Sequence, residues 1–256
     1  MFAKYSAAVL SIYAFFACVP AYAGDSNSPT ANWNGPYAGL ALGMSLGKVD
    51  PEANIIQTSY FTTTDGSQVD PEGRKSLSET AINGGVMVGM NRQYGNFVVG
   101  LEADLTRTQF NESYSSGNVT YLSLPTAIFN ATTKVKSDWL ASVRPRVGYA
   151  HKDSLLFLSA GPALTRFNYE YTYYDTSGTP QSARVSENKL KLGWSIGVGY
   201  EHKLADDWSV KAEYLFSDFT NIVKQNNYFA DFPNDGFNHK VDYTVNNVRI
   251  ALVKSF

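Results

Sequence analysis

The chain has 256 residues, of which 14% are aromatic and 17% are charged. Its 21 lysines and arginines nearly balance its 23 aspartates and glutamates, for a formal charge of -2, so we expect no nucleic-acid partner. The low charge and the aromatic content exclude a disordered chain. The aromatics and the 20 glycines favour an all-β protein, because aromatic side chains suit strands and glycine suits turns.

The N-terminus predicts a secretory signal peptide over residues 1–23. Lys4 precedes an apolar stretch at residues 7–19, and the small-x-small sequence Ala21-Tyr22-Ala23 follows as a cleavage site. The apolar stretch is shorter than the roughly 20 residues that a membrane-spanning helix needs. Cleavage would remove Cys18, the single cysteine, so we expect the mature chain to fold in an exported, oxidising space without a disulfide.

Residues 24–34 are a short N-terminal lead, and after them the chain alternates apolar residues with small or polar ones, in the two-residue period of a strand. Eight such stretches are predicted, at residues 35–48, 80–93, 96–108, 135–150, 155–173, 190–204, 208–219 and 241–256. Pro162 in the fifth stretch predicts a bend or a locally unpaired position, because proline has no backbone N–H to donate.

The connections between these stretches alternate in length. Short turns lie at residues 94–96, 151–154 and 205–207, whereas long polar segments lie at residues 49–79, 110–134, 174–189 and 220–240. Alternate connections of an up-and-down meander lie at the same end, so one end would carry short turns and the other four long loops, as in bacterial outer-membrane barrels. The sequence therefore predicts an all-β fold: an eight-stranded antiparallel up-and-down transmembrane β-barrel over residues 35–256, placed in the cell outer membrane.

The polar face of the strands carries charged residues that we expect inside the barrel, because a membrane barrel turns its apolar face to lipid. These residues are Glu102, Asp104, Arg144, Arg146, Glu201, Lys211, Glu213 and Arg249. An ion path or a catalytic carboxylate pair is the alternative, but a packed and paired core is favoured because a buried charge without a partner is costly. We expect Arg144 and Arg146 to meet Glu102 and Asp104 on the neighbouring strand.

Aromatic residues near the strand ends are expected to form girdles at the two membrane interfaces. They are Tyr37, Trp139, Tyr149, Trp194, Tyr200, Trp208, Tyr214 and Phe256.

Several stretches resemble a known family. They are WNGPYAGLALG, VVGLEADL, WLASVRPRVGYA, GWSIGVGYEHKLADDWSVKAEYLFSDF and the ending VRIALVKSF. They are similar to the small outer-membrane β-barrel proteins of Gram-negative bacteria, a porin-like and opacity-like surface protein family that includes haemin-binding proteins. The resemblance covers most of residues 33–256. It implies contact with outer-membrane lipid and lipopolysaccharide, and recognition by the barrel-insertion machinery of a C-terminal strand ending in Phe256.

The interior of an eight-stranded barrel is just wide enough to be filled by side chains. We therefore expect a protein that contributes to envelope integrity and presents surface loops for recognition of host ligands, by adhesion or haemin binding. The alternative is a small selective channel. No enzymatic activity is predicted, since the sequence contains neither a G-x-S-x-G motif nor a phosphate-binding loop.

No cofactor is required by this interpretation, and the three histidines are too scattered to predict a metal site. Haemin is a possible ligand, because histidine and tyrosine both ligate haem iron, and the candidate residues are His239, Tyr171 and Tyr173. In the alternative interpretation the tyrosines form an interfacial belt and His239 is solvated at the outer end of the barrel.

Overall fold

The computed structural model describes residues 30–205 and 207–256, so the predicted signal peptide lies outside the described residues. The elements are β1 (Gly35–Ile56), α1 (Thr63–Gly73), β2 (Leu77–Tyr94), β3 (Phe97–Ser115), β4 (Val119–Thr120), β5 (Ile128–His151), β6 (Ser154–Asp175), β7 (Ser182–Lys203), β8 (Trp208–Tyr228) and β9 (Gly236–Ser255). Within the described part of the chain, no helix is long and apolar enough to span a membrane.

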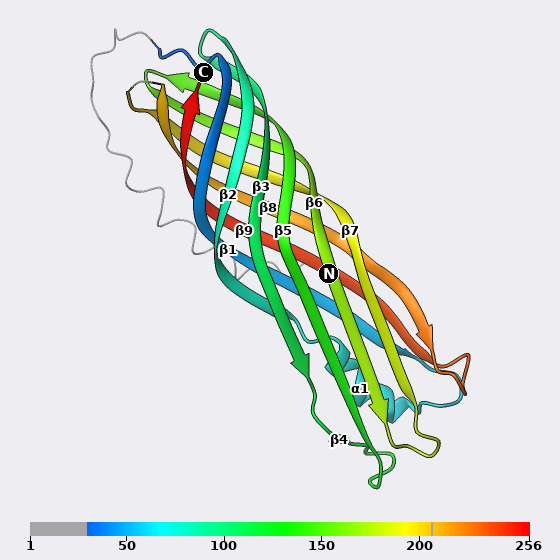
Figure 1. Ribbon diagram of the computed structural model, residues 1–256. Coiled ribbons are helices and arrows are strands. Elements are labelled where there is room, and N and C mark those ends of the chain that lie inside the picture. The colour runs from blue at the N-terminus through cyan, green and yellow to red at the C-terminus, as the bar shows by residue number, and fades with distance from the viewer. Residues whose placement is uncertain (1–29, 206) are drawn as a thin grey trace.

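Eight long strands close into a ring (Figure 1). Each pairs antiparallel with its sequence neighbours, β1 pairs with β9, and β3 pairs with β5, while the two-residue β4 is attached to β5. The prediction of an all-β, eight-stranded antiparallel barrel is confirmed. Figure 1 shows α1 and β4 together at the end opposite the C-terminus, so the long connections gather at one end of the barrel.

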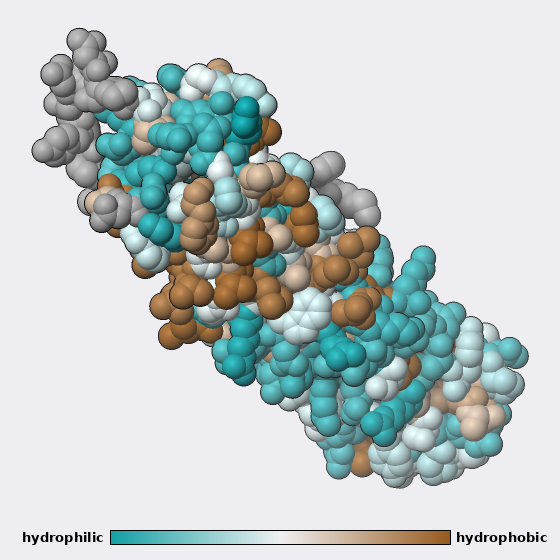
Figure 2. All heavy atoms as spheres, turned by 45° about the horizontal axis from the view of Figure 1, so that its top comes forward, coloured by the Kyte–Doolittle hydropathy of each residue, from teal (hydrophilic) through white to brown (hydrophobic). Residues whose placement is uncertain are grey.

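The outer surface of the ring carries a band of apolar side chains. Leu42 and Ile82 are 73% and 74% exposed, and aliphatic residues at alternate positions of the other strands are exposed in the same way. Figure 2 shows this band across the middle of the visible face, with hydrophilic side chains on both sides of it. Exposed apolar area of this extent is stable only against lipid.

The strands extend well beyond this band. The four long polar segments predicted as loops are therefore partly strand, and the prediction of their lengths is wrong. The connections that remain are residues 57–76, 116–127, 176–181 and 229–235. In β6 the exposed aliphatic residues Leu158 and Leu164 occupy even positions, whereas the buried Phe167 and Tyr169 occupy odd ones. The large apolar residues are thus on the outward face within the lipid band and on the inward face beyond it, where water replaces lipid. A prediction that follows outward apolar residues therefore ends each strand too early.

Beyond the lipid band the ring is no longer closed. The β7–β8 pairing ends at Trp194 and Asp218, and the β2–β3 pairing ends at Gly84 and Arg107. The outer part therefore consists of two sheets, one formed by β2, β1, β9 and β8 and the other by β3, β5, β6 and β7. We call this part the extracellular extension.

Pro162 lacks a partner on β5, which confirms the predicted unpaired position. The β5–β6 pairing runs from Ser142 with Ala163 directly to Arg146 with Ser159. Pro145 of β5 lies within the same gap, so two residues without a backbone N–H interrupt one ladder at the same level. The register on both sides of the gap is unchanged, so the interruption does not displace the neighbouring side chains.

Candidate functional site

Eight charged side chains fill the barrel at the level of the lipid band. All eight of the charges expected inside, four basic and four acidic, are buried, and none is more than 6% exposed. Arg144 Nη1 lies 2.6 Å from Asp104 Oδ1, and Arg144 Nη2 lies 2.9 Å from Glu102 Oε1. The structure therefore brings together the pairs that the sequence predicted for Arg144, across the β3–β5 ladder.

The remaining charges join this cluster into one network. Arg146 binds Glu102 at 3.3 Å and Glu201 at 3.0 Å. Ion pairs of Lys211 with Glu102 at 2.7 Å, and of Arg249 with Glu213 at 2.7 Å, extend it to β8 and β9. Because the basic and acidic groups are equal in number and each has a partner, the barrel interior carries no net charge, which limits the cost of burying so many ions.

Tyr37 belongs to this network, and its assignment to an interfacial girdle is wrong. Its hydroxyl donates to Glu102 Oε2 at 2.7 Å and accepts from Arg146 Nη1 at 2.9 Å. Phe157 packs beneath the Arg146 guanidinium, whose carbon lies 4.1 Å from the ring centroid. The sequence does contain a signal for this inward position. Tyr37, Gly39 and Ala41 are alternate residues of β1 and therefore share one face, and the small residues of that face line the interior.

An aromatic core fills the extracellular extension between its two sheets. Phe167 of β6 packs on Tyr243 of β9, with ring centroids 5.4 Å apart, and Tyr171 packs on Phe237 at 5.3 Å. The rings of this core are almost completely buried. Aromatic pairs at these separations add to the stability gained from burying their area, so the aromatic core holds the two sheets together.

His239 lies in this core, so its expected exposure at the outer end is wrong. Its side chain is completely buried, its Nδ1 is 3.0 Å from the Tyr169 hydroxyl, and its Nε2 is 3.0 Å from Asn227 Oδ1. Burial lowers the pKa of His239 from 6.5 to about 4, so the ring is neutral at physiological pH. The sequence placed His239 at the end of a long loop, whereas it is an inward residue of β9.

The other two haem candidates are also enclosed. Tyr171 is completely buried, and the Tyr173 hydroxyl donates to Asp175 Oδ2 at 2.8 Å. A haem ligand needs a free donor atom facing a cavity that can admit the macrocycle, but both ring nitrogens of His239 are already hydrogen-bonded. The donor atoms of His239 and Tyr173 are thus engaged in hydrogen bonds and Tyr171 is enclosed, so these side chains would have to rearrange before they could bind haem iron.

The segment at residues 57–76 covers the outer end of the aromatic core. It contains α1, which begins with a capping box between Thr62 and Asp65 and buries Val69. Phe61, just before the helix, packs against Phe229 and Phe237 with ring centroids 5.5 and 5.9 Å away. This segment, which we call the cover segment, closes the interior from the outside.

Two buried aspartates hold the cover segment in place. Asp235 accepts hydrogen bonds from the backbone N–H groups of Thr58, Ser59 and Tyr60 at 2.8 to 3.1 Å, and the Tyr60 hydroxyl donates to Asp175 at 2.7 Å. Burial alone would raise the pKa of Asp235, but these hydrogen bonds hold it well below its usual value. Nothing in the sequence separates these two aspartates from solvated loop residues.

The geometry defines an integral outer-membrane β-barrel whose interior is filled by side chains. The family model for the outer membrane protein beta-barrel domain matches residues 9–248, so the chain belongs to this family. The predicted resemblance and the outer-membrane location are confirmed.

The chain is similar to two proteins that are named outer-membrane proteins and to one solved barrel structure. The 31 kDa outer-membrane immunogenic protein of Brucella melitensis is 26% identical over 239 residues, covering 91% of this chain and 90% of that protein. The 22 kDa outer membrane protein of Rhizobium leguminosarum bv. viciae is 27% identical over 175 residues, covering 68% and 66%. Among solved structures, the outer membrane protein OprG of Pseudomonas aeruginosa is 12% identical with a TM-score of 0.46, covering 91% of this chain and all of that one.

Proposed function

We propose that this protein is a closed structural barrel that contributes to envelope integrity and displays the extracellular extension as a rigid platform for recognition at the cell surface. The observation that carries the proposal is the filling of the interior at two levels. The ion-pair network occupies the barrel within the lipid band, and the aromatic core with its cover segment occupies the extension.

A small selective channel is the competing function, and single-channel recording in planar bilayers separates the two. We expect no discrete conductance steps, because an ion crossing the barrel would have to displace paired charges and then packed rings. Insertion is verified by the difference in gel migration between unboiled and boiled protein, so that an absence of conductance steps cannot be explained by a failure to insert. Reproducible steps from inserted protein would favour the channel.

Recognition by the extension is supported by its architecture. Binding residues concentrate on connections held by a rigid scaffold, and the aromatic core supplies that rigidity. The Brucella relatives are named immunogenic proteins, which supports display of part of such a barrel to the outside. The connection at residues 116–127 carries the exposed Leu122 and Leu124, which suit contact with another surface.

The recognition role is tested with proteoliposomes on host-cell monolayers. We expect more binding by liposomes that carry the protein than by empty ones, and a return to the empty-liposome value on replacing Leu122 and Leu124 by serine. A matched control replaces Leu204, an exposed leucine in the turn between β7 and β8 at the opposite end of the barrel, by serine. Equal binding by protein-bearing and empty liposomes would refute adhesion and leave the structural role.

A further inference from the structure

The outer face of β3, β5, β6 and β7 changes its chemistry in rows just beyond the lipid band. The last wholly apolar row across these four strands is Leu105, Ala141, Leu164 and Leu192, which are register partners. One step further out, Arg107 of β3 is the partner of Trp139, and Arg166 of β6 is the partner of Leu190. Successive outward residues on a strand are about 7 Å apart, so two guanidinium groups lie directly above the apolar row.

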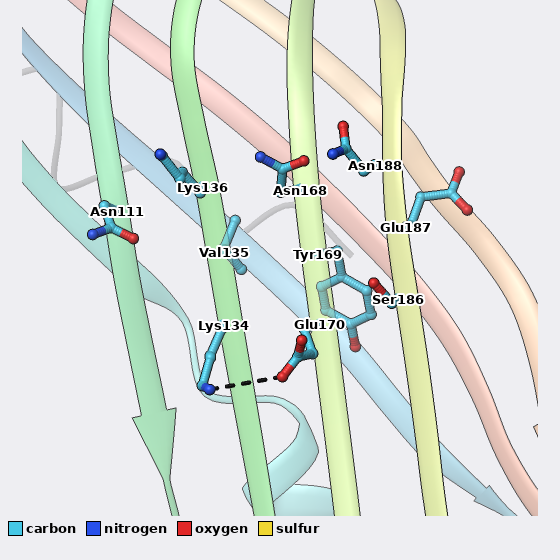
Figure 3. A pocket seen from close by; sticks show the side chains of 10 residues that line it. All are labelled: Asn111, Lys134, Val135, Lys136, Asn168, Tyr169, Glu170, Ser186, Glu187 and Asn188. Carbon is cyan, nitrogen blue, oxygen red and sulfur yellow. Dashed lines mark ion pairs between the residues drawn. The ribbon is translucent and has the colours of Figure 1, made fainter.

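A row of amides follows the arginines. Asn111, Lys136, Asn168 and Asn188 are register partners across the same four strands. Figure 3 shows them side by side, with the Lys134–Glu170 ion pair one step further out. They line a depression of about 280 Å³ in the surface of the sheet.

The two arginines are exposed and differ from the lysines around them. Lys136 is 3.3 Å from Asp138, and Lys134 is 3.7 Å from Glu170. Within residues 30–205 and 207–256, the guanidinium groups of Arg107 and Arg166 form neither an ion pair nor a side-chain hydrogen bond. Their donors are therefore available to an anion from outside the chain.

The opposite face of the barrel does not repeat this arrangement. At the same level, Lys48 of β1 is 2.8 Å from Asp50, and its row continues through Thr244 to Asp218. The next outward row pairs Asp50 with Asp242. The carboxylates on the face of β3, β5, β6 and β7, namely Asp138, Glu170 and Glu187, are each paired with a lysine. What distinguishes that face from the opposite one is its two exposed arginines.

We propose that the outer face of β3, β5, β6 and β7 binds the phosphorylated sugar headgroup of a glycolipid of the outer leaflet. The apolar row contacts the acyl chains, the guanidinium groups of Arg107 and Arg166 bind phosphate, and the amide row binds sugar hydroxyls. The order of these rows matches the order of acyl chain, phosphate and sugar in such a lipid. Arginine suits this role because its planar fork binds phosphate through two parallel hydrogen bonds. This site requires that the barrel be inserted in the membrane. It does not require that the interior be closed or that the extension bind host cells.

The test measures binding of bisphosphorylated lipid A to the folded full chain in detergent micelles by native mass spectrometry. The double variant Arg107→Gln/Arg166→Gln is expected to bind about 30-fold more weakly than the wild type, since each basic group near a membrane surface contributes about a factor of five. The matched control, Lys48→Gln/Lys224→Gln, removes two exposed cations from the opposite face and is expected to bind like the wild type. Equal affinity of the arginine variant and the wild type would overturn the proposal.

Two further arms identify the source of the phosphate. Dephosphorylated lipid A is expected to bind the wild type as weakly as bisphosphorylated lipid A binds the arginine variant. Inorganic phosphate at millimolar concentration is expected not to displace lipid A, because it makes no contact with the apolar and amide rows. Displacement by inorganic phosphate, or undiminished binding of the dephosphorylated lipid, would contradict a phosphorylated glycolipid as the ligand.

Discussion

Replacing Arg144 by leucine is expected to destabilise the barrel by about 3–5 kcal/mol, the range found when one partner of a buried ion pair is removed. The Arg144 side chain is completely buried and lies within 3.4 Å of Glu102, Asp104 and Glu213. Its loss leaves the interior with one excess negative charge that water cannot reach. The measurement is urea unfolding of the protein in lipid vesicles, followed by the shift in gel migration on boiling.

Arg184→Leu is the matched control for this variant. Arg184 also forms an ion pair, 3.0 Å from Glu170, but its side chain is 68% exposed on the extracellular extension. An exposed pair contributes about 0–1 kcal/mol, so this variant is expected to remain close to the wild type. If Arg144→Leu inserts and unfolds like Arg184→Leu, the charge network does not stabilise the barrel.

Replacing Asp235 by alanine is expected to release the start of the cover segment. Three backbone N–H groups and the hydroxyls of Thr58 and Ser59 lose their common acceptor. Hydrogen bonds to charged groups contribute about 1.5–3 kcal/mol each, and their shared loss should lower the local opening free energy by about 3 kcal/mol. Amide hydrogen exchange at Thr58, Ser59 and Tyr60 is then expected to be about 100-fold faster.

Asp138→Ala serves as the control, because Asp138 forms an exposed ion pair on the outer surface of β5. Hydrogen exchange in the cover segment should be unchanged in that variant. Unchanged exchange in the Asp235 variant would show that packing of Phe61 and Val69 alone holds the segment closed.

The pH dependence of this contact follows from the lowered pKa of Asp235. Because the pKa of Asp235 in the closed state lies below the usual 3.8, Asp235 takes up its proton first in the open state, with the cover segment released, as the pH falls. The stabilising contribution is therefore complete above about pH 4 to 5 and is lost only at lower pH. Acidification from pH 7 to pH 5 should leave exchange at Tyr60 unchanged after correction for the intrinsic rate, and an opening in that range would contradict the assignment.

The alternation of residue types was enough to predict the barrel and the charges inside it. Glycine and serine share the inward face with the eight ionisable residues, and leucine and valine share the outward face. The residue types of each strand therefore indicate which of its two faces points into the barrel. The pairing of Arg144 with Glu102 could be predicted because consecutive long strands of an up-and-down meander lie side by side, and β3 and β5 are consecutive long strands. Tyr37 followed the same rule and was misplaced only because an aromatic near a strand end was assigned to the interface.

His239 and the cover segment could not be placed from the sequence. The polar residues of the extension indicate loops when the sequence is taken alone, although Tyr169, Tyr171 and Tyr173 alternate with polar residues as regularly as the residues of the membrane segments do. The hydrogen bonds of Asp235 to Thr58 join positions 177 residues apart, a contact that no local pattern contains.

The sequence by itself determined the two-residue period, the number of long strands and the polar composition of one strand face, because these depend on local geometry and on the cost of exposing apolar groups to the wrong solvent. Only the tertiary structure decided where lipid gives way to water, and hence that the apolar face turns inward beyond Leu164. It also decided that the ring opens into two sheets and that unpaired arginines gather above the lipid on one side. These features arise from register across several strands and from closure of the ring, which bring distant residues together only in three dimensions.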